Sequence, residues 1–269
     1  MDILKGFYRL LNREFVSWTP FLACLLAGSL ILPIMLINSA ITDEFRSSYL
    51  QRYEDLYAAS GSELVFLIAF VLLCLYFLVT IYARYWGSKS IYTYLTLPVG
   101  RLSLYWSKLA VFAISLLLLI GEQFLVYRLG YSIMAGRLSG IRLLNSGLTS
   151  EDINFLMNNG FYLAHVRSEF CRILLPLGFS RLLSSLCLFM VISTGLYYGA
   201  LCERSRKFYG FVPVGISAYL VVRVLLYRMN EASHALNPTG LYPSSLLLLA
   251  FAVFFIVHGS RIIRRGAIA

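Results

Sequence analysis

Few residues of this chain have the types and spacing that support catalysis. Its three histidines, His165, His234 and His258, are far apart in the sequence, and neither an H-E-x-x-H helix nor a G-x-S-x-G nucleophile turn occurs. The stretch Gly87-Ser88-Lys89-Ser90 resembles a phosphate-binding loop in composition, but it lacks the G-x-x-x-x-G-K spacing that cradles phosphates. We therefore expect that this chain is not an enzyme and does not hydrolyse ATP itself. An intramembrane enzyme, with catalytic residues converging from distant spans, is the remaining enzymatic alternative.

The five cysteines do not form a metal or disulfide motif. No C-x-x-C and no Cys/His cluster occurs, and most of the cysteines lie inside or at the end of apolar runs. Cysteines in such surroundings usually serve as small buried hydrophobic side chains. The sequence therefore predicts neither a metal site nor a cofactor in this chain.

Two ionisable residues fall inside apolar runs and merit a hypothesis. Glu122 lies five residues before Tyr127, and Arg223 lies five residues before Arg228, so both are expected at similar depth near the outer end of a membrane span. An ion pair between them would lower the cost of burying either charge. The alternative is that Arg223 extends to the membrane surface while Glu122 is protonated or hydrated.

The composition indicates that the solvent around most of the chain is a lipid bilayer. Of the 269 residues, 59% are hydrophobic and only 13% are charged, whereas soluble domains have about 45–50% and about 25%. The formal charge of +10 would suit nucleic acid, but the basic residues lie between long apolar runs and form no basic domain. We therefore expect these basic residues to lie at the surfaces of the bilayer, and we do not expect the chain to bind nucleic acid.

Six apolar segments approach the roughly 20 residues that a helix needs to cross the hydrocarbon core. Tyr and Trp residues cluster at their ends, as expected for amphipathic rings at the headgroup level. The sequence thus predicts an all-α polytopic membrane protein with a single transmembrane domain over residues 1–269. Its spans run approximately over residues 20–40, 64–83, 109–127, 182–201, 208–227 and 241–257.

The distribution of charge assigns sides to these spans. If the N-terminus is cytoplasmic, the cytoplasmic segments hold 13 of the 23 basic residues and three acidic ones, which accounts for the whole net charge of +10. The outer loops and the spans then hold ten residues of each sign. This is the positive-inside pattern, and it predicts that both termini are cytoplasmic.

Two segments outside the spans have patterns of their own. Residues 1–18 place Ile3, Phe7, Leu11, Phe15 and Trp18 on one helical face, with cations on another. They predict an amphipathic helix in the cytoplasmic interface, or else a simple basic anchor. Residues 128–181 form the longest segment between spans, and we expect them to form a large outer segment. Within it, residues 161–175 are mostly apolar but include several charged residues, so we expect a helix there that does not span the membrane.

The cytoplasmic connection between the second and third spans, residues 85–108, is unusually apolar for a loop. Ile91, Tyr94, Leu95 and Leu97 give residues 88–97 the spacing of a short amphipathic helix, which must stop near Pro98. A solvated loop would not require these side chains, whereas a protein partner would bury them.

At this connection the chain resembles the permease subunits of type 2 ABC exporters, in particular small bacterial ones encoded apart from their ATPase. In that family a Ser- or Thr-rich stretch runs into Leu-Pro-x-x-Arg and is followed by Ser-Lys before the third span. Here the stretch from Tyr92 to Leu97 runs into Pro98-Val99-Gly100-Arg101 and is followed by Ser107-Lys108. The long segment 128–181 departs from the family, which often keeps that connection short. By resemblance, the ATPase-coupling residues are Ser88, Lys89, Ile91, Tyr92, Tyr94, Leu95, Leu97, Pro98 and Arg101.

The resemblance implies a function that the residues alone do not. The chain would be the transport subunit of an ATP-driven exporter in the bacterial cytoplasmic membrane, moving an amphiphilic peptide, antibiotic or lipid-like molecule. Its partners would be a separate ABC ATPase, which carries the ATP and magnesium, and a second permease chain, the same or homologous. The alternatives are a self-contained secondary transporter or channel, and a structural or assembly protein of the membrane.

Overall fold

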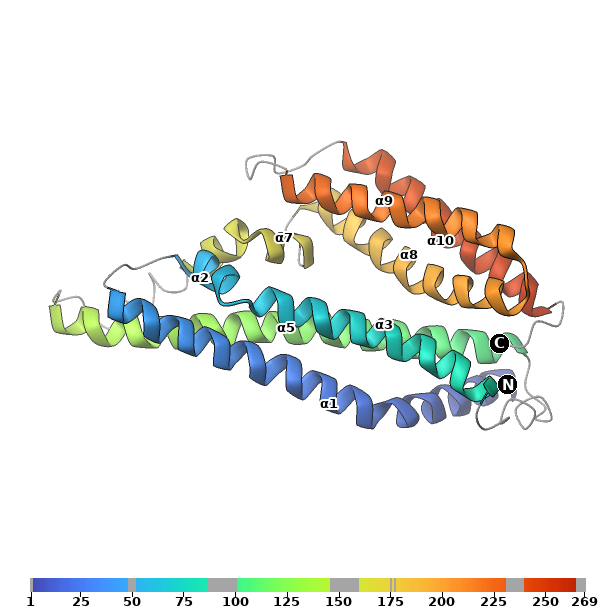
Figure 1. Ribbon diagram of the computed structural model, residues 1–269, viewed down its shortest axis with the longest axis horizontal. Coiled ribbons are helices and arrows are strands. Elements are labelled where there is room, and N and C mark those ends of the chain that lie inside the picture. Colours follow the sequence, from blue (N-terminus) through green and yellow to red (C-terminus); the bar gives the residue numbers. More distant parts are fainter. Residues whose placement is uncertain are drawn as a thin grey trace. The chain divides into compact units, whose positions relative to one another are not determined.

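The described part of the chain consists of helices. The computed structural model describes residues 2–47, 52–86, 101–145, 160–174, 176, 178–230 and 240–264. No strand occurs among them (Figure 1). The helices are α1 (Asp2–Ser47), α2 (Tyr53–Ala59), α3 (Ser62–Trp86), α5 (Arg101–Asn145), α7 (Glu169–Leu174), α8 (Phe179–Arg204), the 3₁₀ helix η1 (Phe208–Gly210), α9 (Phe211–Asn230) and α10 (Leu241–Arg264).

Six of these helices contain a segment that is long and apolar enough to cross a membrane. The segments are Gly6–Thr42, Ser62–Ala83, Leu102–Arg137, Phe179–Arg204, Phe208–Met229 and Leu241–Arg264. They correspond one to one with the six predicted spans. The chain is therefore an all-α, multi-pass membrane protein, as its composition predicts.

Two helices are longer than the sequence pattern indicates. Helix α1 continues without a break from Asp2 to Ser47, so residues 2–18 are helical but do not form a separate helix before the first span. Helix α5 continues past Tyr127 to Asn145, so the first part of the predicted outer segment 128–181 is an extension of the third span. Apolar periodicity marks where a chain enters lipid, but it does not mark where backbone hydrogen bonding stops.

The chain divides into two compact units. Unit 1 comprises Met1–Leu22, Leu72–Leu116 and Gly178–Ala269, and unit 2 comprises Ala23–Val71 and Leu117–Leu177. Unit 1 includes 16 of the 23 basic residues but only 4 of the 13 acidic ones, so its formal charge is +12 while that of unit 2 is −2. Both termini belong to the strongly basic unit.

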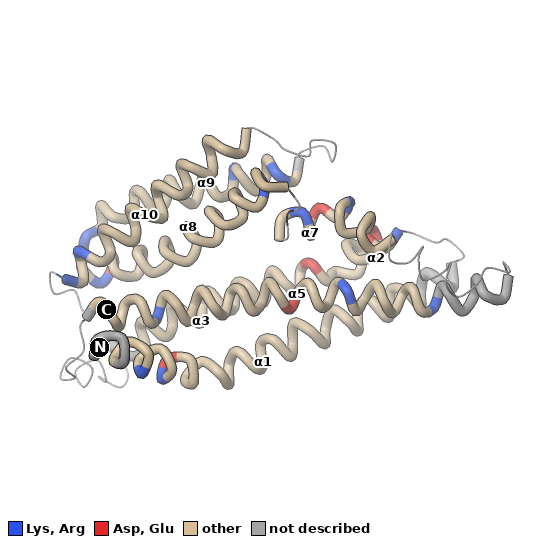
Figure 2. Tube along the Cα trace, turned by 180° about the vertical axis from the view of Figure 1, so that it is seen from behind, with Lys and Arg blue, Asp and Glu red and all other residues tan. Residues whose placement is uncertain are grey.

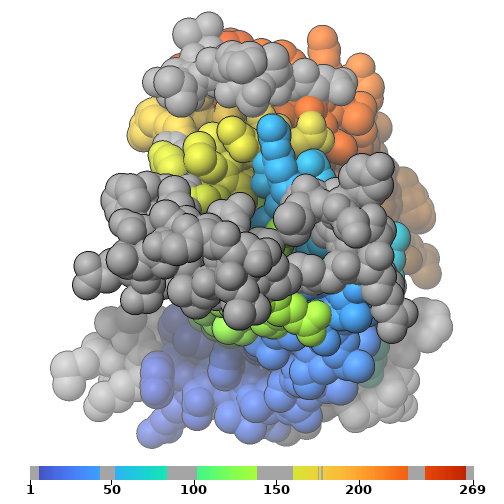
Figure 3. Space-filling model, turned by 90° about the vertical axis from the view of Figure 1, so that its left-hand side faces the viewer, coloured from blue at the N-terminus to red at the C-terminus, as the bar shows by residue number. Residues whose placement is uncertain are grey.

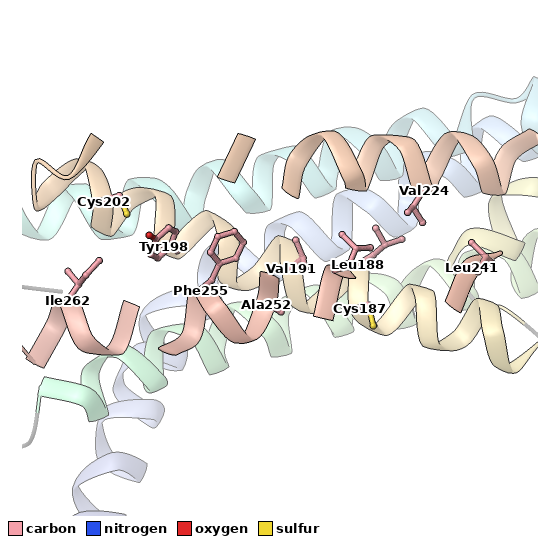
Figure 4. Close-up of a cluster of buried hydrophobic side chains, with 11 residues drawn as sticks. Cys187, Leu188, Val191, Tyr198, Cys202, Val224, Leu241, Ala252, Phe255 and Ile262 are labelled. Carbon is pink, nitrogen blue, oxygen red and sulfur yellow. The ribbon is translucent and has the colours of Figure 1, made fainter. Parts of the chain in front are cut away.

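In unit 1, helices α8, α9 and α10 pack side by side (Figure 1). Figure 4 shows the buried side chains along this contact, among them Leu188 and Tyr198 of α8, Val224 of α9, and Ala252 and Phe255 of α10. Within a bilayer, such helices are held by close packing rather than by exclusion of water, because lipid is as apolar as the side chains. The outward faces of α9 and α10 carry large exposed hydrophobic residues, which suit contact with lipid.

The rest of unit 1 is joined by aromatic contacts between α1, α3, α5 and α8. The ring of Trp18 meets Tyr76 edge to face at 5.0 Å, and Phe77 stacks on Phe112 at 4.1 Å. Tyr105 stacks on Tyr197 at 4.8 Å. Offset and edge-to-face pairs add to the packing energy beyond their buried area, so these rings fix the lateral positions of four helices.

Unit 2 is built around three buried tyrosines, the C-terminal part of α1 and the C-terminal part of α5. Tyr53, Tyr57 and Tyr127 pack with Ile37, Val126, Met134, Ala164 and Cys171. Gly61 joins α2 to α3 with a φ of 76°, a left-handed conformation that glycine adopts without the steric cost that a Cβ brings. The predicted helix over residues 161–175 is two pieces, because residues 160–167 are helical, Ser168 interrupts the helix, and α7 follows. The buried side chains of Ala164 and Cys171 attach the two pieces to the core.

Candidate functional site

The structure frames the predicted coupling segment without describing its interior. Helix α3 ends at Trp86 and helix α5 begins at Arg101. The predicted coupling residues Ser88, Lys89, Ile91, Tyr92, Tyr94, Leu95, Leu97 and Pro98 lie outside the described residues. Arg101 is described as the first residue of α5. The segment therefore connects the ends of two membrane-spanning helices, as the sequence predicts.

Several contacts bring other parts of unit 1 to the same end as this connection. Leu10 of α1 packs against Leu104, in the first turn of α5. A Cβ built at Gly259 of α10 would lie 3.4 Å from the Tyr105 hydroxyl and 3.7 Å from Leu201. The N-terminal part of α1, the start of α5, the end of α8 and the end of α10 thus share one end of unit 1, which we call the basic end.

A hydrogen bond joins the second and fourth spans at the basic end. The hydroxyl of Tyr82, near the end of α3, donates to the carboxylate of Glu203, near the end of α8. The sequence assigned both helix ends to the cytoplasmic side but gave no signal that these two side chains meet. The bond links the helix that leads into the coupling segment to the helix that leads into the next connection on the same side.

The connection from α8 to α9 is a tight basic turn that includes Arg204, Arg206 and Lys207. Arg206 has a φ of 53°, which is uncommon for a residue with a side chain and costs about 1–2 kcal/mol. A Cβ at Gly210 would clash with the sulfur of Cys202, so the turn approaches α8 as closely as a glycine allows. Figure 2 shows Lys and Arg at these ends of α8 and α10.

A part-buried polar contact at the basic end joins α8 to α10. The hydroxyl of Tyr198 lies 2.7 Å from Nδ1 of His258, and the His258 ring stacks on Phe254 at 5.5 Å. Two parallel spans are therefore held in register by a hydrogen bond within apolar surroundings. His258 is the only histidine among the described residues of unit 1, and its contact with Tyr198 joins α10 to α8.

Glu122 and Arg223, the predicted intramembrane pair, belong to different units, so their pairing stays a prediction. Within unit 2, the hydroxyl of Ser29 donates to Oε2 of Glu122 at 2.7 Å, and the Glu122 side chain is buried. Arg223 is exposed on α9, which suits extension of its guanidinium to the membrane surface. Ser29 is the partner that sequence reasoning missed, because a serine within an apolar run does not show which helix it faces.

Beside Glu122, a polar network holds α2 against α5. The side-chain amide of Gln123 donates to the hydroxyl of Tyr57, and the hydroxyl of Tyr53 donates to the carbonyl oxygen of Tyr127 at 2.8 Å. Burial raises the pKa of Cys171, which packs on these rings, to about 12, and it raises the pKa values of Tyr53 and Tyr57 above their usual range. Burial therefore favours the neutral form of each of these three groups, and the two hydrogen bonds hold α2 against α5.

The part of the chain that the structure describes shows no metal centre. Within the described ranges, no group of three or more His, Cys, Asp or Glu side chains is arranged to hold a metal ion. Comparison with protein-family models, curated proteins and solved structures finds no match to this chain.

Proposed function

We propose that this chain is the membrane-spanning permease subunit of an ABC exporter, powered by a separately encoded ATPase. The observation that carries the proposal is the connection between α3 and α5, whose apolar and aromatic residues form the Leu-Pro-x-x-Arg pattern between the ends of two spans. Its substrate would be an amphiphilic peptide, antibiotic or lipid-like molecule that crosses the bacterial cytoplasmic membrane.

The geometry of unit 1 supports this role because side-chain contacts at the basic end join α3 and α5 to α8. Helix α5 contacts α8 through Tyr105 and Tyr197, and α3 contacts α8 through Tyr82 and Glu203. A displacement of the α3–α5 connection would therefore reach the fourth span through two independent contacts. In the proposed mechanism ATP closes the ATPase dimer, and the docked connection transfers that rigid-body motion to the spans. Permease chains would act in pairs, with either identical or homologous partners.

Charge substitution in the coupling segment tests this function. Ile91→Asp and Leu95→Asp each place a carboxylate in the expected ATPase contact, where an unpaired buried charge costs several kcal/mol. We expect these variants to insert normally but to lose co-purification with a Walker A ATPase encoded beside the chain, together with substrate-stimulated hydrolysis. Asn154→Asp, in the predicted outer segment, is the matched control. Full association and transport in the Ile91 and Leu95 variants would contradict the coupling role.

A self-contained transporter or channel is the second candidate, and the burial of Glu122 in a span favours it. Intramembrane carboxyl groups often mark ion or proton pathways. Purified chain reconstituted alone in liposomes distinguishes the two. Ion or proton flux without any ATPase, abolished by Glu122→Gln, would support the second candidate. No flux from the chain alone, together with ATP-dependent transport that appears when the ATPase is added and that survives Glu122→Gln, would support the exporter.

A further inference from the structure

Unit 2 contains a pocket that neither proposed function uses. Its volume is about 220 Å³, the space of about seven water molecules, so it suits one small chemical group rather than a protein partner. Tyr53, Tyr131 and Met134 are among the residues that line its apolar part, and its charged lining residues are Arg52, Glu54 and Arg167. Figure 3 shows the sky-blue residues around α2 beside the yellow-green residues of the 160–174 region on this face of unit 2.

The apolar part of the pocket is held in place by packing and by one hydrogen bond. Tyr53 is buried, its hydroxyl is bonded to the Tyr127 carbonyl, and its ring meets that of Tyr131 edge to face at 5.3 Å. A Cβ at Gly160 would lie 2.5 Å from the Tyr131 hydroxyl, so only glycine leaves that ring its place beside the pocket. These walls do not need to reorganise when a ligand enters, which lowers the entropic cost of binding.

The charged residues give the pocket an excess of positive charge. Nη1 of Arg167 lies 3.9 Å from Oε1 of Glu54, and the side chains are 49% and 11% exposed. That oxygen makes no hydrogen bond to the residues described, so the ion pair is long and weakly directed. Arg52 is exposed at the same pocket. Two guanidinium groups against one carboxylate favour an anion, and their planar donors match carboxylate and phosphate oxygens.

We propose that this pocket binds a small amphiphile with one acidic group. Its carboxylate or phosphate would contact Arg52 and Arg167, and its apolar part would rest on Tyr131 and Met134. Glu54 would oppose binding, because its carboxylate competes for Arg167. Either a free amphiphilic acid or the headgroup of an acidic lipid has this chemistry. The inference stands on unit 2 alone and does not depend on ATPase coupling.

Opposite charge substitutions test the proposal with 4-phenylbutyrate as the soluble acid. Full-length protein in phosphatidylcholine nanodiscs is titrated by saturation-transfer NMR, with 4-phenylbutylamine as the oppositely charged probe. We expect saturable binding of the acid, weakened at least tenfold by Arg52→Gln or Arg167→Gln and strengthened severalfold by Glu54→Gln. Arg137→Gln removes an arginine of unit 2 that bonds to Asn38 and Thr42 away from the pocket, and it should leave the affinity unchanged. General destabilisation of the protein could not raise the affinity of the Glu54 variant for the acid while it lowers that of the Arg167 variant.

A filled pocket and an acidic lipid complete the test. Ala135 lines the pocket, so Ala135→Phe should abolish binding, whereas Ser132→Phe, at an exposed position on the same helix, should not. If phosphatidylglycerol raises the unfolding temperature through Arg52 and Arg167 while the soluble acid does not bind, the ligand is a lipid headgroup. Equal affinities for the acid and the amine would overturn the proposal. It would also be overturned if the Arg52 and Arg167 variants bound the soluble acid, and were stabilised by phosphatidylglycerol, to the same extent as the wild type.

Discussion

The carboxyl group of Glu122 lies inside a span, where a charge without partners would be costly. Its recorded partner is the hydroxyl of Ser29 on α1, at 2.7 Å, while its Oε1 is buried without a hydrogen bond among the residues described. A single hydroxyl donor compensates only a small part of the cost of burying an ionised carboxylate. At the scale of single residues, this bond attaches the first span to the third within unit 2.

A double-mutant cycle measures that attachment. Ser29→Ala and Glu122→Gln should each lower the free energy of unfolding. The double variant should lose about 0.5–1.5 kcal/mol less than the sum of the two single losses, which is the range for hydrogen bonds within membranes. The measurement is unfolding by SDS in mixed micelles. Ser39→Ala is the control, because the Ser39 hydroxyl donates to the carbonyl of Leu36 within its own helix. Strict additivity would show that Ser29 and Glu122 do not interact.

The same cycle with Arg223→Gln in place of Ser29→Ala tests the predicted intramembrane pair. Coupling between Glu122 and Arg223 would support the ion pair, whereas additivity would leave Arg223 extended to the membrane surface. Sequence spacing identified both residues because charges stand out in apolar runs. It could not identify Ser29, because the choice of a hydrogen-bond partner depends on which helix faces meet, and depth along a span does not determine this.

At the scale of elements, the turn from α8 to α9 is a tight connection closed by a backbone hydrogen bond. Arg206 adopts a left-handed conformation with a φ of 53°, while Lys207 beside it has a φ of −97°. The backbone amide of Lys207 bonds to the carbonyl of Cys202 at 3.0 Å, which closes the turn. The turn thus fixes where the fifth span starts relative to the end of the fourth.

Glycine substitutions at adjacent positions test this constraint. Arg206→Gly relieves the left-handed strain, whereas Lys207→Gly only adds chain entropy to the unfolded state. The free energy of unfolding should therefore be higher in Arg206→Gly than in Lys207→Gly by about 1–2 kcal/mol. The readout is SDS-induced unfolding of both variants in the same micelles. Equal stabilities would show that Arg206 bears no strain.

The number and positions of the membrane-spanning helices were predictable from the sequence, but the residues at which the helices begin and end were not. All six spans follow from apolar length, since an apolar run of this size has to lie in lipid. The continuity of α1 through residues 2–18 and the extension of α5 to Asn145 were not predictable from hydropathy, because helical hydrogen bonding continues through polar residues. The coupling residues 88–98 remain a prediction from sequence, since they lie outside the described residues.

At the scale of the whole molecule, the account depends on which side of the membrane the basic end faces. Unit 1 has a formal charge of +12, and its contacts gather both terminal helices, the start of α5 and the end of α8 at one end. The positive-inside rule assigns that end to the cytoplasm. An ATPase could reach residues 88–97 only if this assignment holds. The pocket of unit 2 belongs to residues that the same rule assigns to the outer side.

Thiol accessibility in intact cells measures this sidedness directly. In a background without the five native cysteines, single cysteines replace Lys89, Arg52 and Asn154, and cells are treated with a membrane-impermeant maleimide before and after permeabilisation. Arg52 is preferred to its neighbour Tyr53, because Tyr53 is buried while Arg52 is exposed. The account predicts that positions 52 and 154 react in intact cells and that position 89 reacts only after permeabilisation. Labelling of position 89 from outside would contradict the topology, and with it the proposed docking of an ATPase.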